Sequence, residues 1–540
     1  GHKRRAATPR GAGVITGTWP LLRLAMRRDR WLIIGWLAAL VLTTASSAKA
    51  TIDLYGDPVA GQAAAHAVNT NPALVAMYGP IFDERAMGAL AIFKLLLLFG
   101  ALMTTLFVVI VRRHTRLEEE SGRAELVAAT GTGELAPLAA AVLQGSGLAV
   151  LLGVLVALGN IAAGLPATGS WSFGLGWAGL ALVAVALTAV AAQVFSSSRS
   201  VSGAVAAALG AFYFVRAIGD ISKTDAFVWA SPFGWLSRMR PYADERWLPF
   251  GLLILLWAVG TAIAFALRAR RDLGSGLVAA RPGPATGRMG SVVGLVSRLH
   301  RPGLIGWTLG LVALGAILGG IAPSAADFAG TQEVQDMLRR MGGSGLLKDA
   351  FLAIETSFMG VAAAAYAISV VARPATEESA GRTEVVLATG TSRTGVYLTA
   401  VGYAMAAAAV LLAAFGLSAG VAFGRAEDDL GQIPRLAAAA LGQLPAVWVL
   451  VAISALAFGL RAAWAPIGWV LLVAAVVVGH IGELLNLPKW LVKSSPFAHV
   501  PRMPVEEFRF DAGVLTLLAI TIVMTFAGLI AYRRRDIASG

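Results

Sequence analysis

Long runs of almost uncharged residues constrain this chain more than any other feature of its sequence. Runs such as 136–163 and 172–195 contain no Asp, Glu, Lys or Arg. A membrane hydrocarbon core about 30 Å thick is crossed by roughly 20 apolar residues in a helix, and these runs are long enough. The alternation of apolar and polar residues that is typical of an outer-membrane barrel is absent. We therefore predict an all-α polytopic membrane protein.

The expected spans fall into two sets of six. The first set is 31–49, 88–111, 136–163, 172–196, 201–218 and 247–268. The second set is 303–322, 355–372, 396–423, 435–460, 466–483 and 512–532. Because six spans return a chain to the side on which it started, the two halves are predicted to be parallel repeats.

The composition supports a membrane protein and indicates its orientation. Charged residues make up 14% of the chain, against about a quarter in soluble proteins. Lys and Arg gather in the segments that lie on the same side as the N-terminus, which predicts that both termini are cytoplasmic. The net charge of +13 then reflects topology and does not indicate a nucleic-acid partner. The chain has no cysteine, and its six histidines are scattered, so no disulfide and no metal site is expected.

One short charged segment occurs twice. Residues 118–132 read EEESGRAELVAATGT and residues 377–391 read EESAGRTEVVLATGT, with ten of fifteen positions identical. Other matches follow in the same order: 35–36 with 306–307, 218–220 with 481–483, 231–233 with 495–497, and 270–276 (RRDLGSG) with 534–540 (RRDIASG). This register predicts an internal duplication into halves 1–268 and 303–540, with a cytoplasmic linker over 269–302.

Each copy of the repeated segment lies between the second and third spans of its half. Glu119 precedes Arg123 by four residues, as Glu378 precedes Arg382, which favours a helical ion pair. Gly131 and Gly390 stand where a helix would end in a left-handed residue. We therefore expect one short amphipathic helix near 117–131 and another near 376–390.

Repetition favours a function for this helix over a merely solvated loop. Loops that do nothing diverge quickly, whereas two similar polar helices on one membrane face are typical of docking to a partner with two equivalent surfaces. The candidate docking residues are Glu118, Glu119, Arg123, Glu125, Glu377, Glu378, Arg382 and Glu384.

A basic amphipathic segment also precedes the first span of each half. These segments are WPLLRLAMRRDR (19–30) and VVGLVSRLHRPG (292–303). Both are expected to lie in the membrane plane as interfacial helices. The alternative is that their arginines only flank the cytoplasmic end of a span, as is common in membrane proteins. The residues expected at headgroup level are Arg27, Arg28, Arg30, Arg298 and Arg301.

This layout resembles an ABC-2-type exporter permease with both halves fused in one chain. The shared pattern EExxGRxExVxATGT resembles the loop of actinobacterial permeases of the tetronasin/multidrug exporter type, such as mycobacterial ones. The resemblance implies that the repeated segments are coupling helices for two copies of a separate ATP-binding subunit, which would hold Mg-ATP. It also implies export of hydrophobic or amphipathic compounds (drugs, antibiotics or lipids) across the bacterial plasma membrane by alternating access.

The chain itself carries no nucleotide-binding motif. No G-x-x-x-x-G-K-[ST] and no Gly-Lys dipeptide occurs in it, so no catalytic residue and no cofactor is expected here. A twelve-span ion-coupled secondary transporter is the alternative, and it would be expected to show an acid in the middle of a span. A membrane enzyme acting on lipid is a third possibility, and it would need clustered acids or histidines near an interface.

No clear mid-span acid is present, which favours an apolar or amphipathic cargo. Arg216 falls in a span and is expected to pair with Asp220, four residues on. Aromatic and Met side chains in the spans are candidates for the substrate pathway, with helix packing as the alternative. They are Trp36, Phe93, Phe99, Phe107, Phe212, Phe214, Phe358, Met359 and Tyr366. The outer segments 50–87, 219–246, 323–354 and 484–511 are expected to form short helices, as a gate or as simple connections.

Overall fold

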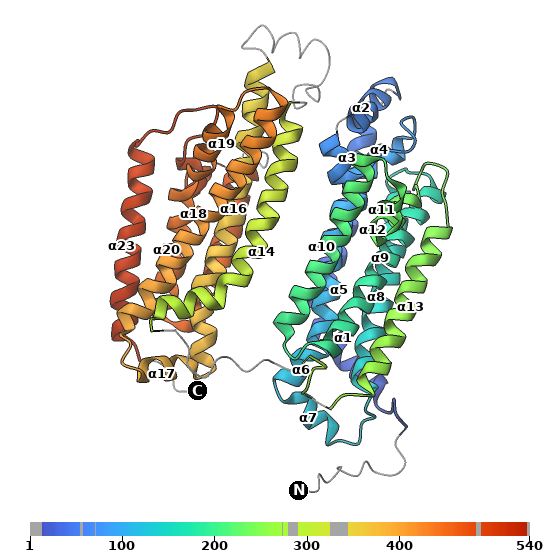
Figure 1. Ribbon diagram of the computed structural model, residues 1–540, viewed down its shortest axis with the longest axis horizontal. Coiled ribbons are helices and arrows are strands. Elements are labelled where there is room, and N and C mark those ends of the chain that lie inside the picture. The colour runs from blue at the N-terminus through green and yellow to red at the C-terminus, as the bar shows by residue number, and fades with distance from the viewer. Residues whose placement is uncertain are drawn as a thin grey trace. The chain divides into compact units, whose positions relative to one another are not determined.

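The computed structural model describes residues 13–54, 58–70, 72–272, 274–278, 290–323, 344–481 and 488–536. These residues form helices, turns and irregular connections, with no strand among them. The chain separates into two compact units, unit 1 (Gly1–Pro282) and unit 2 (Gly283–Gly540). Figure 1 shows each unit as a bundle of long helices. Parts of the predicted elements lie outside the described residues: 273 and 279–289 of the linker, 55–57, 71, 324–343 and 484–487 of the outer segments, and 273, 482–483 and 537–540 of the repeats.

The predicted number of twelve apolar helices long enough to span a membrane is confirmed within the described residues. In unit 1 they are α1 (Thr18–Leu54), the run Met87–Glu120, α8 (Ala136–Ala162), α9 (Ala167–Val194), α10 (Ser198–Ser222) and α13 (Leu248–Arg268). In unit 2 they are α14 (Val292–Ile321), α16 (Ser344–Ser379), α18 (Arg393–Ala426), the run Gln432–Leu460, the run Ala462–Gly479 and α23 (Ala512–Arg534).

Three of these runs contain more than one helical element. Met87–Glu120 comprises α4 (Met87–Lys94), a π-helical turn (Leu95–Phe99), α5 (Gly100–Arg113) and α6 (Arg116–Glu120). Gln432–Leu460 comprises α19 (Gln432–Leu441) and α20 (Leu444–Leu460). Ala462–Gly479 contains a 3-10 turn (Ala462–Trp464), α21 (Ile467–Val476) and the start of a π-helical turn (Val477–Ile481).

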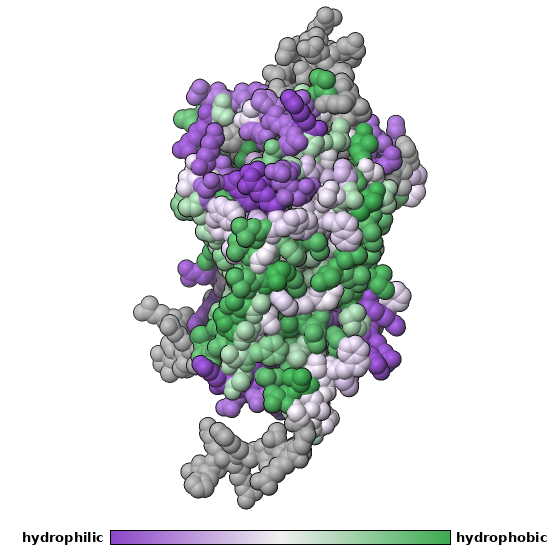
Figure 2. Space-filling view, turned by 90° about the vertical axis from the view of Figure 1, so that its right-hand side faces the viewer, coloured by the Kyte–Doolittle hydropathy of each residue, from purple (hydrophilic) through white to green (hydrophobic). Residues whose placement is uncertain are grey.

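The fourth span is the most enclosed helix of each unit. In its apolar window, 83% of residues are buried in α9 and 67% in Gln432–Leu460, against 11% in α13. Side chains on the open face of α13, such as Leu255 and Val259, are large and apolar. Figure 2, which faces unit 1, shows an apolar belt between polar ends. Such a belt is the surface expected of a bundle in lipid.

Glycines let the helices of each unit approach closely. A Cβ atom on Gly174 of α9 would lie 2.2 Å from the carbonyl oxygen of Gly153 on α8. In unit 2, a Cβ on Gly459 of α20 would lie 2.4 Å from the carbonyl oxygen of Gly528 on α23. Larger residues would push these backbones apart, so the small residues set the helix spacing.

Each unit has two ends, which we call the repeat end, where the repeated segment lies, and the distal end (Figure 1). Short helices form in the outer segments, as expected: α2 (Pro58–Thr70), α3 (Pro72–Tyr78), α11 (Asp225–Trp229) and α12 (Pro232–Arg238) in unit 1, and α22 (Lys489–Val492) in unit 2. Arg216 pairs with Asp220 at 3.1 Å, as predicted, and also donates to the Val75 carbonyl at 3.3 Å. This buried arginine thereby ties α3 to α10.

Tyr242 fastens the loop between α12 and α13 to the bundle. Its ring fills a slot left by two glycines, since a Cβ would lie 2.5 Å from it on Gly88 and 2.1 Å from it on Gly169. Its hydroxyl lies 2.8 Å from that of Ser170. Burial raises the pKa of Tyr242 to about 12, so the phenol stays neutral.

Candidate functional site

In unit 1 the repeated segment forms two short helices. α6 ends at Glu120, Gly122 adopts a left-handed conformation (φ 73°), and α7 (Arg123–Ala128) follows. The prediction of one continuous helix near 117–131 is wrong for this reason, because a left-handed residue ends an α-helix and redirects the chain. Gly131 is also left-handed (φ 75°), which confirms the predicted termination.

Unit 2 repeats this arrangement. α16 carries Glu377 and Glu378 in its last turn and ends at Ser379, Gly381 is left-handed (φ 68°), and α17 (Arg382–Ala388) follows. The predicted helix near 376–390 is therefore also divided. Gly390 (φ 81°) takes up the expected left-handed conformation after α17.

The glycine turn changes the ion pairs of the segment. Across the turn Arg123 donates from Nε to Glu118 at 2.9 Å, so the predicted pairing with Glu119 is wrong. In unit 2 Arg382 likewise pairs with Glu377 and not with Glu378. The helical four-residue spacing does not hold because the chain turns between the acid and the arginine.

A second cation completes the first acid site in each unit. Glu118 also pairs with Arg28 of α1, whereas Glu377 pairs with Arg373, one turn earlier in α16, at 3.3 Å. Arg28 is thus the one predicted in-plane residue that contacts the repeated segment. Arg27, Arg30, Arg298 and Arg301 are exposed.

The basic segments that precede each half are continuous with the first span. Residues 19–30 belong to α1, a 37-residue helix about 55 Å long at 1.5 Å per residue, which exceeds the thickness of a membrane core. α14 contains Pro302, and Figure 1 shows its first turns running sideways before it rises. Proline removes a backbone hydrogen bond and bends a helix. Near the bend Tyr366 and Arg373 donate to the carbonyls of His300 and Leu299, each at 3.3 Å.

The second acid of the segment is clamped by an arginine that follows the last span of the unit. In unit 1 the Glu119 carboxylate accepts from Arg271 at 2.5 and 2.9 Å, from Arg116 at 2.8 Å and from the Gly274 amide at 3.2 Å. The side chains of Glu119 and Arg271 are 9% and 2% exposed. Charge-assisted bidentate contacts of this kind are strong and orienting.

Unit 2 has the equivalent clamp. Arg535 Nη2 donates to both carboxylate oxygens of Glu378, at 2.7 and 2.9 Å. The guanidinium group also lies over the rings of Phe458 and Tyr532, at 5.2 and 5.1 Å from their centres. Arg271 and Arg535 occupy the same position in the RRDLGSG and RRDIASG motifs. Two separately repeated motifs therefore contact each other in each unit.

The outward faces of α7 and α17 are also alike. Leu126 and Val385 occupy equivalent positions and are 71% and 68% exposed. The acids before them, Glu125 and Glu384, are exposed too. Each short helix thus presents an apolar side chain beside a carboxylate, which is a common arrangement at protein interfaces that combine an anchor with orienting charge.

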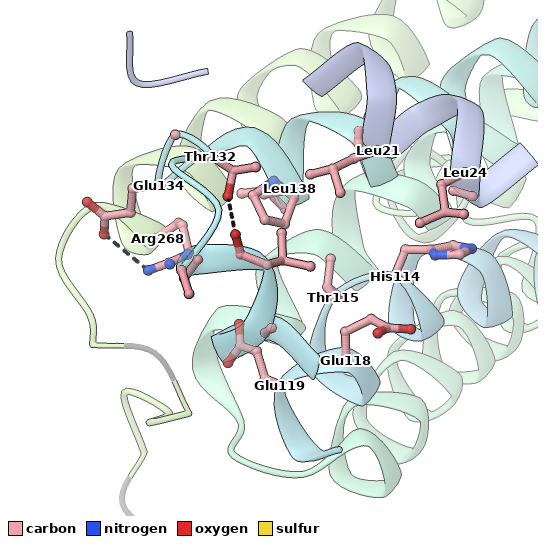
Figure 3. Close-up of a pocket in the computed structure, with 18 of the residues that line it drawn as sticks. Leu21, Leu24, His114, Thr115, Glu118, Glu119, Thr132, Glu134, Leu138 and Arg268 are labelled. Atoms are coloured by element: carbon pink, nitrogen blue, oxygen red, sulfur yellow. Dashed lines mark hydrogen bonds and ion pairs between the residues drawn. The ribbon is translucent and has the colours of Figure 1, made fainter. Parts of the chain in front are cut away.

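Behind α7, unit 1 contains a cavity of about 660 Å³. Figure 3 shows 18 of the residues that line it. The lining comes from α1, the stretch from the end of α5 through α6 and α7 to the start of α8, Gln193 of α9, and the end of α13 with the residues after it. Sequence reasoning missed this cavity, because its wall is assembled from four separate parts of the chain, within residues 21–28, 114–140, 193 and 268–272.

Sequence reasoning also missed Asp29, which is 1% exposed at the repeat end of unit 1. Its carboxylate lies 3.0 Å from Arg113 and 2.5 Å from His114 Nε2. These contacts join α1 to the end of α5. The signal available in the sequence was one acid within a run of arginines, RRDR (27–30).

The candidate pathway residues differ in their burial. Phe107, Met359 and Tyr366 are buried, and Phe214 and Phe358 are exposed to 45% and 42%. The others, Trp36, Phe93, Phe99 and Phe212, are partly buried. None of the nine lines the cavity behind α7, and their role in transport stays a prediction.

Comparison with known proteins identifies relatives of the whole chain. A family model described as "Multidrug efflux system permease Rv1217c, C-terminal domain" matches residues 20–267 and 289–533. The chain is 39% identical to the multidrug efflux system permease protein Rv1217c of Mycobacterium tuberculosis over an alignment of 542 residues. The alignment covers 99% of this chain and 97% of that protein.

Proposed function

The chain belongs to the family of the multidrug efflux permease Rv1217c, and from that premise we propose that it is the membrane subunit of an ATP-driven ABC exporter. It is a multi-pass bacterial membrane protein of a permease and efflux family. In the proposed complex, two copies of a separate ATP-binding subunit bind α7 and α17 and hydrolyse Mg-ATP. The cargo is a hydrophobic or amphipathic compound, such as a drug, an antibiotic or a lipid.

The observation that carries this proposal is the matched pair of short helices. α7 and α17 each expose an apolar side chain next to a carboxylate, and each lies between the second and third spans of its unit. A partner with two equivalent surfaces would find two equivalent docking sites. The rim charges would orient the partner, while Leu126 and Val385 would enter apolar pockets on it.

The clamps give this docking site a mechanical connection. Glu119 and Glu378 are fixed to arginines that directly follow the sixth span of each unit, through Arg271 and Arg535. A push on α7 or α17 would therefore reach both the second and the sixth span of its unit. We propose that this displacement drives alternating access, with both termini and both docking helices in the cytoplasm, as the distribution of Lys and Arg favours.

The proposal is tested by gentle purification of the full chain from its native membrane. We expect a nucleotide-binding subunit to accompany it at two copies per chain, measured by intact-complex mass, with ATP hydrolysis in the complex. Drug uptake into inverted vesicles that depends on ATP and persists after the proton gradient is collapsed would agree. Transport driven by an ion gradient, with no nucleotide-binding protein present, would replace the proposal with the secondary-transporter alternative.

A further inference from the structure

We infer that the cavity behind α7 is a binding site for a small hydrophobic molecule that carries at most one charge. Its volume of about 660 Å³ lies within the range of roughly 300–1,000 Å³ of small-molecule sites. The choice of ligand class rests on the proposed function, whereas the cavity itself is defined by residues of unit 1.

The inner wall of the cavity is apolar. Leu21 and Leu24 of α1 and Leu138 of α8 line it (Figure 3), as does Val127 of α7. Ala25 of α1 is 5% exposed and also lines the wall. A molecule with an apolar body would exchange water contacts for these side chains, which is the main source of affinity at such sites.

The charged groups at the rim are already paired with one another. Arg28 pairs with Glu118, Arg271 with Glu119, and Arg268 with Glu134 at 3.2 Å. The lining also includes Asp272, so it holds four carboxylates against three guanidinium groups. Arg123 and Arg116 also pair with Glu118 and Glu119, at 2.9 and 2.8 Å. A multiply charged ligand would have to break these pairs, whereas an apolar ligand with at most one charge would not.

The cavity leaves α7 without packing beneath it. No residue of α7 is buried, and Ala124 lines the cavity. At the equivalent position of α17 stands Thr383, which is 6% exposed. An occupant of the cavity would supply the missing contacts under α7. Because α7 is the proposed docking helix, occupancy would then strengthen docking of the ATP-binding subunit.

The absence of cysteine from the chain permits a direct test by thiol protection. Val127→Cys places a thiol in the cavity wall, and Leu126→Cys places one on the outward face of the same helix. The full chain of each variant, in dodecyl maltoside, is treated with N-ethylmaleimide at increasing concentrations of ethidium, an apolar monocation. We expect ethidium to slow modification at position 127 roughly tenfold at about ten times its Kd, since protection follows occupancy. The rate at position 126 should not change.

Filling the cavity provides the matched control. Ala25→Phe and, separately, Ala128→Phe are added to Val127→Cys, because both alanines line the cavity. Ala38→Phe, on an exposed position of α1, is the control for the added ring. Protection should be lost with either filling substitution and kept with Ala38→Phe. Equal protection of both thiols, no protection at position 127, or protection that survives both filling substitutions would overturn the inference.

A further arm identifies the source of the natural ligand. Lysophosphatidylcholine is added in place of ethidium: protection at position 127 would extend the ligand class to membrane lipids, and its absence would restrict the site to transported compounds. All arms use the permease alone. A failure here therefore leaves the copurification test untouched, and a failure of copurification leaves the cavity result standing.

Discussion

Reversing the charge of Glu378 should release α17 from unit 2. Glu378 and Arg535 are 4% and 14% exposed, and one guanidinium nitrogen contacts both carboxylate oxygens. Breaking a buried ion pair by changing one partner costs about 3–5 kcal/mol. Because Arg535 keeps some contact with solvent, we expect a cost near the lower limit for Glu378→Arg and for Arg535→Glu.

Exchanging both residues should restore most of this loss. Glu378→Arg with Arg535→Glu re-forms an ion pair, but the new acid no longer stacks on Phe458 and Tyr532. Loss of cation–π contacts is worth about 1 kcal/mol, so the double variant should stay that much less stable than the wild type.

The same exchange should fail in unit 1. There Arg116, whose side chain is fully buried, contacts Glu119 at 2.8 Å, and an arginine at position 119 would face it directly. The thermal unfolding midpoint of Glu119→Arg with Arg271→Glu should therefore remain as low as that of either single change.

A buried reporter on α17 measures the effect. Thr383→Cys is modified only when α17 opens, and Val385→Cys, at 68% exposure, is the control for the intrinsic rate. A loss of about 3 kcal/mol raises the open population, and hence the modification rate at position 383, about 100-fold. In the charge-exchanged variant the modification rate at position 383 should rise only about fivefold, which corresponds to its remaining loss of about 1 kcal/mol. An unchanged rate in Glu378→Arg, or equal rates in single and double variants, would refute the reasoning.

Two further predictions concern the docking faces and the tyrosine slot. Glu125→Lys with Glu384→Lys should weaken binding of the ATP-binding subunit at least about tenfold, because the new lysines would meet like charges on the partner. The free energy of unfolding should change by less than about 0.5 kcal/mol because both sites are exposed. Normal export by this variant would show that the docking assignment is wrong. Gly169→Ala should cost about 1–3 kcal/mol of stability and so lower the thermal unfolding midpoint, because its Cβ would overlap the ring of Tyr242. Gly147→Ala, where nothing lies within 4 Å, should not lower it.

The architecture could be predicted from the sequence because lipid imposes a length and a polarity on every span. The apolar runs marked all twelve long helices, and the buried pair of Arg216 and Asp220 followed from helical spacing alone. The left-handed state of Gly131 and Gly390 also followed, since few other residues adopt it readily.

The details of the repeated segment could not be predicted, because a second glycine competes with the helical pattern. Gly122 and Gly381 were visible in both copies, but helical spacing of acid and arginine favoured a continuous helix. The two clamps could not be predicted because the sequence does not show which distant segments meet. Glu119 and Arg271 each belong to a repeated motif, and nothing in either motif specifies the other as its partner.

The clamp in unit 1 also orders the events of biosynthesis. Glu119 and Arg271 are 152 residues apart. At a synthesis rate of about 5–20 residues per second, the acid leaves the ribosome roughly 8–30 s before its arginine. During that interval α6 and α7 lack the contact that fixes them to the end of the bundle. The contact that fixes α6 and α7 to the bundle therefore forms only after all six spans of unit 1 have been made, and the docking site proposed for the ATP-binding subunit would be complete only then.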